Sequence, residues 1–282
     1  MNRLGVVGCG LMGSGIAEVA AKSRCDVLVV DTTDEILTKA AVRINTSLAK
    51  AQEKGKLDEP ADVIFGRITF TTDLKAMGDR EIVIEAIREA ISDKATLLER
   101  LDAIVSDACI IGSNTSSIPI ATIAAASRRP DRIVGIHFFN PVPVMPLVEV
   151  ISALQTAPAV ADAAADFCAN VLGKSVIRAA DQAGFVVNAL LVPYLLSAIR
   201  MLQNGIATRE DIDTGMVGGC NMPIGPLALS DLIGLDTMLL VSESLYAEHH
   251  DPSCAPPALL RRHVEAGLLG RKSGRGFFDY SA

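Results

Sequence analysis

Three glycines within six residues, Gly8, Gly10 and Gly13, most constrain what this chain can fold into. They lie between residues 3–7, an apolar segment predicted to be a strand, and residues 14–21, whose composition is typical of a helix. A turn from a strand into a helix directs free backbone N–H groups and the positive end of the helix dipole at one point, where a pyrophosphate can bind. The spacing therefore predicts a dinucleotide site formed by Gly8, Gly10, Leu11, Met12 and Gly13.

A second apolar segment, residues 25–30, ends in Asp31, about 20 residues beyond the glycines. A carboxylate at this position accepts hydrogen bonds from the adenosine ribose hydroxyls and repels a 2′-phosphate. We therefore expect the cofactor to be NAD rather than NADP. The alternative is a tight turn followed by a strand that ends in aspartate by chance.

Composition excludes several other classes of protein. The chain of 282 residues is 50% hydrophobic, which supplies a sizeable core, and its net charge of −7 argues against nucleic-acid binding. The longest apolar run, residues 189–199, is about half a membrane span. The first predicted strand begins almost at Met1, so we expect no signal peptide and a cytoplasmic protein. Scattered cysteines without C-x-x-C spacing predict small buried side chains, with neither disulfides nor a metal site: Cys9, Cys25, Cys109, Cys168, Cys220 and Cys254.

Strand-like and helix-like segments alternate in the first part of the chain. This alternation predicts an α/β fold with a doubly wound, mostly parallel sheet of Rossmann type and room for an antiparallel edge. From Gly184 onward the pattern is only helical, with a capping box at Thr208 to Asp211. We predict an NAD-binding domain over residues 1–183 and a helical substrate and dimerisation domain over residues 184–282. Further strands are predicted at residues 67–71, 82–85, 109–112, 132–137, 147–151 and 175–178, and a helix at residues 91–105.

A histidine and a glutamate stand out at the predicted strand ends. His137 ends one strand and Glu149 lies within the next, and the loop between them is stiffened by three prolines. If the two strands are neighbours, the imidazole and the carboxylate can meet. A neutral imidazole can take a proton from an alcohol, and a paired carboxylate fixes its tautomer. The alternative is a core histidine and a solvated glutamate on an edge strand.

Seven stretches together resemble the L-3-hydroxyacyl-CoA dehydrogenase family, most of all its short, single-function 3-hydroxybutyryl-CoA dehydrogenases. The resemblance covers residues 5–280, and the fourth stretch is the most specific. The stretches are GCGLMGSGIA, VIEAIREAISDK, SNTSSIPI, RIVGIHFFNPVPVMPLVEV, GFVVN, IGPLALSDLIGLD and GRKSGRGFFDY.

The resemblance implies catalytic roles for four residues. His137 is then the general base, with Glu149 as its partner. Ser116 bonds the 3-oxygen of the substrate, and Asn188 positions the thioester. Family members often carry arginine after this asparagine, whereas this chain has Ala189 and lacks the charge at that position.

The resemblance also implies contacts with the cofactor and with CoA. Glu89 and Lys94 are expected near the nicotinamide ribose and the diphosphate, Asn140 and Lys272 at other parts of NAD, and Ser47 and Lys54 at the CoA nucleotide. Alternatives stay open for several of them. Lys54 and Lys94 suit a solvated helix face, Ser116 suits a helix N-cap, and Lys272 suits an exposed tail.

The implied activity is the NAD-dependent interconversion of (S)-3-hydroxyacyl-CoA and 3-oxoacyl-CoA, without a metal. The resemblance favours a four-carbon acyl group, although Arg200 or Arg209 would suit a dicarboxylic chain. A homodimer is expected through the helical domain, since its segments are apolar over more than one face. Two alternatives are a sugar-acid dehydrogenase of the same fold without a CoA site, and a non-catalytic NAD-binding relative.

Overall fold

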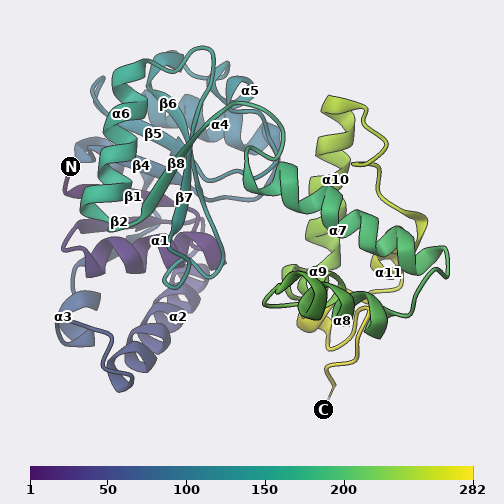
Figure 1. The fold of residues 1–282 in the computed structure, drawn as a ribbon. Helices are drawn as coiled ribbons and strands as arrows, with labels where there is room; N and C mark the ends of the chain where they lie inside the picture. Colours follow the sequence, from purple (N-terminus) through teal and green to yellow (C-terminus); the bar gives the residue numbers. More distant parts are fainter. Residues whose placement is uncertain (282) are drawn as a thin grey trace. The chain divides into compact units, whose positions relative to one another are not determined.

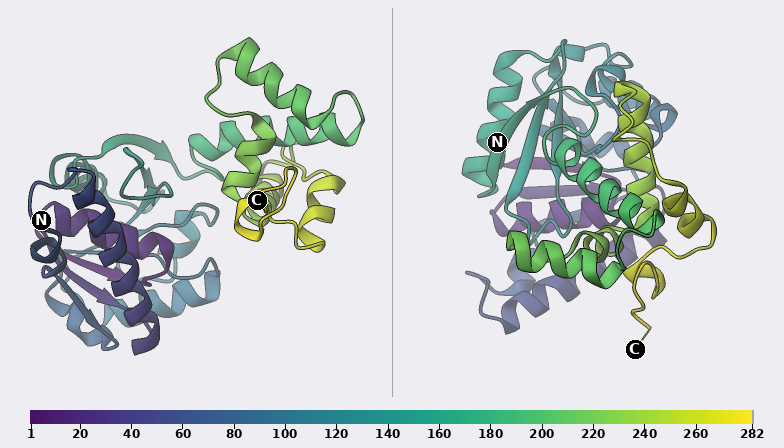
Figure 2. Two further views of the ribbon diagram at one scale, coloured as in Figure 1. Left: turned by 90° about the horizontal axis from the view of Figure 1, so that it is seen from below. Right: turned by 45° about the vertical axis from the view of Figure 1, so that its right-hand side comes forward.

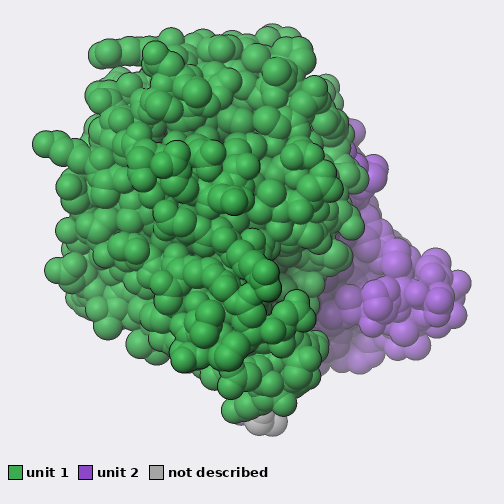
Figure 3. All heavy atoms as spheres, turned by 90° about the vertical axis from the view of Figure 1, so that its left-hand side faces the viewer, with its two compact units in different colours: residues 1–182 green, residues 183–282 purple. Residues whose placement is uncertain are grey.

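The computed structural model describes residues 1–281 and divides the chain into two units, residues 1–182 and the residues from Ala183 onward (Figure 3). The first unit is built on a sheet of eight strands in the order β3-β2-β1-β4-β5-β6-β7-β8. The strands are β1 (Arg3–Val7), β2 (Asp26–Val30), β3 (Ile68–Thr71), β4 (Ile82–Glu85), β5 (Ile110–Ser113), β6 (Ile133–Phe138), β7 (Leu147–Ser152) and β8 (Ser175–Ala180).

Strand direction confirms the predicted fold class. Strands β1 to β6 are parallel, whereas β7 runs antiparallel to β6, and β8 pairs in parallel with β7. The chain moves outward from β1 to β3 and then returns to β4 on the other side of β1. The carboxyl ends of β1 and β4 therefore flank the point at which the strand order reverses, where open α/β sheets bind their ligands.

Six α-helices connect these strands, and the long α2 packs against α1 and α3 (Figures 1 and 2). Helix α2 begins after Thr33, whose hydroxyl accepts a hydrogen bond from the backbone N–H of Ile36. Its buried residues recur every three or four positions, which turns one face to the core. The helices are α1 (Leu11–Lys22), α2 (Asp34–Glu53), α3 (Ala61–Phe65), α4 (Ile91–Asp102), α5 (Ile120–Ala124) and α6 (Pro158–Asp166).

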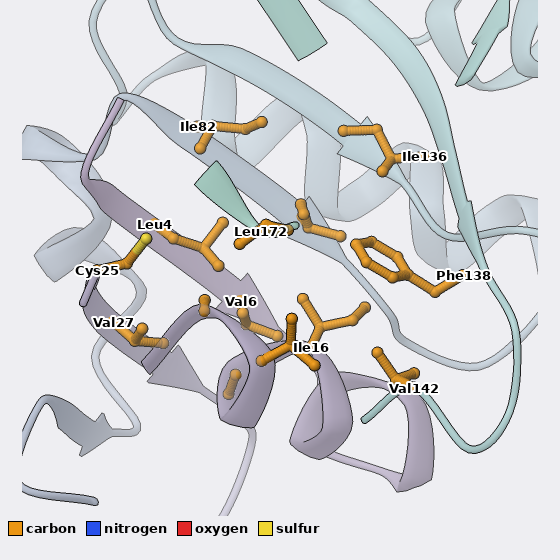
Figure 4. Close-up of a cluster of buried hydrophobic side chains, with 14 of the residues drawn as sticks. Leu4, Val6, Ile16, Cys25, Val27, Ile82, Ile136, Phe138, Val142 and Leu172 are labelled. Carbon is orange, nitrogen blue, oxygen red and sulfur yellow. The ribbon is translucent and has the colours of Figure 1, made fainter. Parts of the chain in front are cut away.

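The main core lies between the sheet and α1, α2 and α6. Leu4 and Val6 of β1 extend toward α1, where Ile16 is fully buried, and Phe138 and Val142 extend the cluster beyond β6 (Figure 4). Alternate residues point to the two faces of a strand, so the intervening Gly5 lies against Met77 on the opposite face. This packing fixes the strand ends from which the candidate site is built.

The second unit is helical. Its helices are α7 (Val187–Gln203), α8 (Arg209–Cys220), α9 (Pro226–Ile233), α10 (Leu235–His249) and α11 (Ala258–Glu265). The predicted cap at Thr208 is present, because its hydroxyl accepts a hydrogen bond from the N–H of Asp211 at 3.1 Å. Buried Asp231 holds the carboxyl-terminal segment on α9 by accepting hydrogen bonds from the N–H groups of Phe277 and Phe278, both at 2.9 Å.

Some sequence-based expectations need correction. Helix α1 begins at Leu11 rather than at residue 14, because the carbonyl of Gly10 already accepts a hydrogen bond from the N–H of Ser14. Helix α4 ends at Asp102 instead of continuing to residue 105. Cys220 is exposed near the end of α8, whereas the other five cysteines are buried, and all six are free thiols. Within residues 1–281 no helix is both long enough and apolar enough to cross a membrane.

Candidate active site

Three glycines shape the turn after β1. The backbone conformation requires Gly8, close packing requires Gly13, and neither reason applies to Gly10. Gly8 has a φ of 89°, and a Cβ added to Gly13 would lie 1.8 Å from the carbonyl oxygen of Gly8. Gly10 is different, because it is exposed and no atom lies within 4 Å of an added Cβ. Open space in front of this backbone fits a group that binds close to it.

The start of α1 has the properties of an anion site. Its N-cap, Gly10, provides no side chain to accept from the first N–H groups, and the first turn contains no acidic residue. These N–H groups and the helix dipole favour a pyrophosphate. The exposed Leu11 and half-buried Met12 begin the helix. The turn therefore fits the cofactor expected from the sequence.

Asp31 follows β2 and is fixed against the same turn. Its Oδ2 accepts a hydrogen bond from the N–H of Cys9 at 2.7 Å, and its Oδ1 accepts one from the N–H of Thr32 at 2.7 Å. Partial burial acts to raise the pKa of the Asp31 carboxyl, but these hydrogen bonds outweigh it and hold the pKa below its ordinary value. Asp31 is therefore an anion beside the glycine turn at neutral pH.

Arg43 of α2 also reaches the turn, which the sequence did not reveal. Its Nη1 donates to the carbonyl oxygens of Cys9 and Gly10 at 3.1 and 3.2 Å and to the hydroxyl of Ser14 at 2.7 Å. The helical pattern placed Arg43 only on a basic face. A contact between residues so distant in sequence leaves no local signal that could have identified it.

His137 and Glu149 are in contact, as expected for residues on neighbouring strands. The two residues are directly paired across β6 and β7, and His137 Nδ1 lies 2.7 Å from Glu149 Oε2. His137 is 6% exposed and Glu149 is 0% exposed. The alternative of a solvated glutamate on an edge strand is therefore wrong, since β8 covers the outer side of β7. A hydrogen bond from Nδ1–H to the carboxylate places the basic lone pair of the neutral ring on Nε2.

The loop after β5 presents Ser116. Its N–H donates to Glu89 Oε1 at 3.1 Å, while the N-cap of α5 is Pro119, so the alternative role as a helix cap is wrong. Within residues 1–281 the Ser116 hydroxyl makes no hydrogen bond that competes with a substrate. Asn114 Oδ1 accepts from the N–H of Phe138 at 3.0 Å, which ties this loop to the end of the strand that carries His137.

Lys94 is buried in the first unit instead of lying on a solvated helix face. It is 1% exposed, and its Nζ lies 2.7 Å from Glu85 Oε1 and 3.3 Å from Glu89 Oε2. Burial acts to raise the pKa of Glu89, but the Lys94 ammonium and nearby hydroxyls outweigh it and lower the pKa. Glu85 was not predicted as a site residue. Its position at the end of a predicted strand, where site residues of this fold class lie, could have indicated it.

Asn140 is exposed in the loop between β6 and β7. Lys174, another residue that the sequence reasoning missed, holds this loop by donating to the carbonyl oxygens of Val142 and Met145, each at 2.7 Å. The loop is held in two ways. Its three prolines stiffen the backbone, and the Lys174 ammonium binds two of its carbonyl oxygens.

The remaining predicted residues lie on α2, at its end, or in the second unit. Ser47 is half-buried on α2, and Lys54 is exposed at the end of that helix. In the second unit, Asn188 is half-buried in the first turn of α7. Lys272 is exposed and forms an ion pair with Asp236. Residues 1–281 contain no group of His, Cys, Asp and Glu side chains arranged to hold a metal ion.

Known proteins match the chain over nearly its whole length. Residues 3–182 match the model of the 3-hydroxyacyl-CoA dehydrogenase NAD-binding domain, which indicates NAD(H) binding, and residues 184–280 match the model of the C-terminal domain of the same family. The chain is 51% identical to 3-hydroxybutyryl-CoA dehydrogenase of Mycobacterium tuberculosis, with 99% of each chain covered. It is 47% identical to a probable 3-hydroxybutyryl-CoA dehydrogenase of Deinococcus radiodurans, covering 99% of this chain and 100% of that one.

The fold agrees with a solved structure as well. The crystal structure of (S)-3-hydroxybutyryl-CoA dehydrogenase of Ralstonia eutropha superposes with a TM-score of 0.95 at 45% identity, and 100% of each chain is covered. The glycine turn, the paired histidine and glutamate, and the similarity of both units to one family lead to the same result. The chain belongs to the 3-hydroxyacyl-CoA dehydrogenase family and is an oxidoreductase.

Proposed function

We propose that the chain catalyses the NAD-dependent oxidation of (S)-3-hydroxybutyryl-CoA to acetoacetyl-CoA, and the reverse reaction. The buried pair of His137 and Glu149, with 2.7 Å between Nδ1 and Oε2, is the observation that carries this proposal. The relatives in M. tuberculosis and D. radiodurans that carry the name of this activity support it.

His137 acts as the general base in the direction of oxidation. Its Nε2 takes the proton of the 3-hydroxyl group, and Glu149 keeps Nδ1 protonated and stabilises the imidazolium that forms. Bound NAD supplies the acceptor for the hydride that leaves C3. The hydroxyl of Ser116 donates to the 3-oxygen, and the amide of Asn188 orients the thioester. In the reverse direction the imidazolium returns its proton to the same oxygen.

The cofactor is held mainly by residues at the strand ends of the first unit. The N–H groups of the glycine turn bind the pyrophosphate, and Asp31 binds the adenosine ribose. Glu89 and Asn140 face the nicotinamide end. Because Lys94 is buried and paired with Glu89 at 3.3 Å, we assign it an effect on the cofactor through Glu89. We also propose that Lys272 contacts NAD. For this, its ion pair with Asp236 has to open, or Lys272 has to bind Asp236 and NAD at the same time.

The acyl chain is proposed to have four carbons and no terminal carboxylate. Ser47 on α2 and Lys54, which caps the end of that helix, bind the CoA nucleotide. A dicarboxylic chain requires a cation at the end of the acyl pocket, but Arg200 already donates to three backbone carbonyl oxygens at 2.7–2.9 Å. Arg209 is bonded to the carbonyl of Phe277 and to the carboxylate of its neighbour Glu210. These bonds leave neither arginine as a ready partner for a second carboxylate.

We further propose that residues 184–282 provide the substrate and dimerisation domain. Several apolar side chains of the second unit are exposed, among them Leu190 at 73% and Leu232 at 52%. Burying such side chains against a second copy of the chain removes them from water. Light scattering at micromolar concentration tests this part of the proposal, and a monomer contradicts it.

The reaction is tested by following the absorbance of NADH in the presence of acetoacetyl-CoA. Turnover by the unchanged protein is expected, and His137→Gln should lower kcat by roughly two to four orders of magnitude while the Kd for NADH stays nearly constant. His249→Gln is a matched control, since His249 is exposed at the end of α10. Oxidation of a free polyol acid without turnover of the CoA ester would instead identify a sugar-acid dehydrogenase.

A further inference from the structure

The buried carboxylate of Glu85 and the half-buried carboxylate of Glu89 hold the loop of residues 113–117 at its two ends. At the first end, the hydroxyl of Ser113 donates to Glu85 Oε1. At the other end, Glu89 Oε1 accepts from the hydroxyl of Ser117 at 2.9 Å and from the N–H groups of residues 116 and 117 at 3.1 and 3.3 Å. The hydroxyl of Thr115 donates to the same oxygen. We call this arrangement the loop clamp.

Lys94 joins the two halves of the loop clamp. Its Nζ lies 2.7 and 2.9 Å from the two oxygens of Glu85, and 3.3 Å from Glu89 Oε2. The ammonium is therefore bound more closely by Glu85 than by Glu89. Because Lys94 is 1% exposed, water does not replace a lost partner, and the position of this charge depends on both carboxylates.

The loop clamp binds Ser116 through its backbone N–H and not through its hydroxyl. The hydroxyls of Ser113, Thr115 and Ser117 all donate to the two carboxylates, whereas Ser116 contributes its N–H. The Ser116 hydroxyl is therefore not one of the groups that the loop clamp uses. The bond from the N–H of Phe138 to Asn114 Oδ1 fixes the same loop relative to the strand of His137.

We propose that Glu85 is a positioning residue, which acts through Lys94 and Glu89 to place the Ser116 hydroxyl for the reaction. This inference rests on the proposed role of Ser116. By holding the ammonium 3.3 Å from Glu89, Glu85 leaves Glu89 Oε1 to the loop. Without the Glu85 charge, Lys94 shifts toward Glu89 and competes with the loop for that carboxylate. Small displacements of a group that contacts the reacting atoms cost much of the rate.

The test is a double-mutant cycle of Glu85→Gln and Ser116→Ala with acetoacetyl-CoA and NADH. Glu85→Gln preserves the shape of the side chain and removes its charge. We expect each single variant to lower kcat by about 10- to 100-fold, with KM for acetoacetyl-CoA changed by less than about threefold. In the double variant, kcat should fall no more than about threefold below that of the slower single variant, because both changes act on the same hydroxyl.

Glu81→Gln is the matched control, because Glu81 lies just before β4, at the opposite end of that strand, and binds the N–H groups of Asn2 and Arg3. It should leave kcat unchanged. Thermal unfolding is measured for every variant. If Glu85→Gln does not fold, Ser113→Ala takes its place in the cycle, with an expected kcat loss of about three- to tenfold that vanishes in the Ser116→Ala background.

The outcomes separate the two proposals. A folded Glu85→Gln protein with unchanged kcat, or losses that multiply in the double variant, overturns the positioning role and leaves the proposed reaction intact. If Ser113→Ala replaces Glu85→Gln and its loss of kcat multiplies with the loss caused by Ser116→Ala, the positioning role of Glu85 is overturned as well. Absence of turnover by the unchanged protein refutes the proposed function, and the role of Glu85 with it.

Discussion

Replacing Gly10 with alanine should separate cofactor binding from folding. Gly10 is exposed, its φ is −59°, and no atom lies within 4 Å of an added Cβ. The free energy of unfolding should therefore change by no more than about 1 kcal/mol, the usual size of a glycine-to-alanine effect at an unstrained position. The same methyl group would stand in front of the N–H groups at the start of α1, where we place the pyrophosphate.

The size of the binding loss follows from the hydrogen bonds at stake. A hydrogen bond between a backbone N–H and a charged oxygen contributes about 1.5–3 kcal/mol. Loss of one such bond raises Kd by roughly 10- to 150-fold, since about 1.4 kcal/mol corresponds to a factor of ten. Fluorescence titration measures Kd for NADH, and urea unfolding of the same samples measures stability.

Gly13→Ala is the matched comparison, because the same substitution three residues later meets backbone atoms. Its Cβ would lie 1.8 Å from the carbonyl oxygen of Gly8 and 3.3 Å from Val6 Cγ1. The turn has to move, and we expect a loss of about 3 kcal/mol or more of unfolding free energy. A Gly10→Ala protein of normal stability that binds NADH as tightly as the unchanged protein would refute the placement of the pyrophosphate at this turn.

Three further results are expected. The unchanged protein should prefer NADH over NADPH by at least about tenfold in kcat/KM, and Asp31→Ala should narrow this ratio; equal use of both cofactors contradicts the role of the carboxylate. A thiol reagent should label Cys220 in the native protein and all six cysteines after unfolding, because burial raises the pKa of Cys9 and of Cys168 to about 12, and that of Cys109 to about 11; rapid native labelling of a second thiol contradicts this. The pKa of Glu89 is lowered from 4.5, so its ionised form stabilises the fold above that pH, and the contribution is lost as pH falls through the folded pKa. When the pH is lowered from about 6 to about 3, the free energy of unfolding should therefore decrease less for Glu89→Gln than for the unchanged protein. An equal decrease for both proteins argues against the ion pair.

Local patterns predicted the glycine turn and the fold class, because each depends on residues that are close in sequence. The turn needs only a strand, glycines and a helix in succession, and the alternation of segments implies the parallel sheet. The His137–Glu149 pair could be predicted for a related reason, since its members are only 12 positions apart and one loop joins their strands.

Charged residues that serve the protein interior could not be predicted in the same way. Lys94 and Arg43 lie on amphipathic helices, where a lysine or an arginine is by default solvated. Their burial or engagement depends on partners from other elements, such as Glu85 at the end of β4 and the carbonyl of Cys9. Lys174 likewise binds carbonyl oxygens about 30 positions earlier, and a carbonyl has no side-chain signature in a sequence.

The reversal of direction between β6 and β7 determines where this chain can tolerate insertions. Directly paired residues of an antiparallel hairpin point to the same face, and successive side chains alternate between faces. One residue added within β7 ahead of Glu149 would turn its carboxylate to the opposite face of the sheet, away from His137, and would reverse every later side chain of that strand. Residues added to the connection at 139–146 leave the pairing unchanged, provided that the strands keep their register. The spacing within each of the two strands should therefore stay constant in natural variants and in engineered proteins.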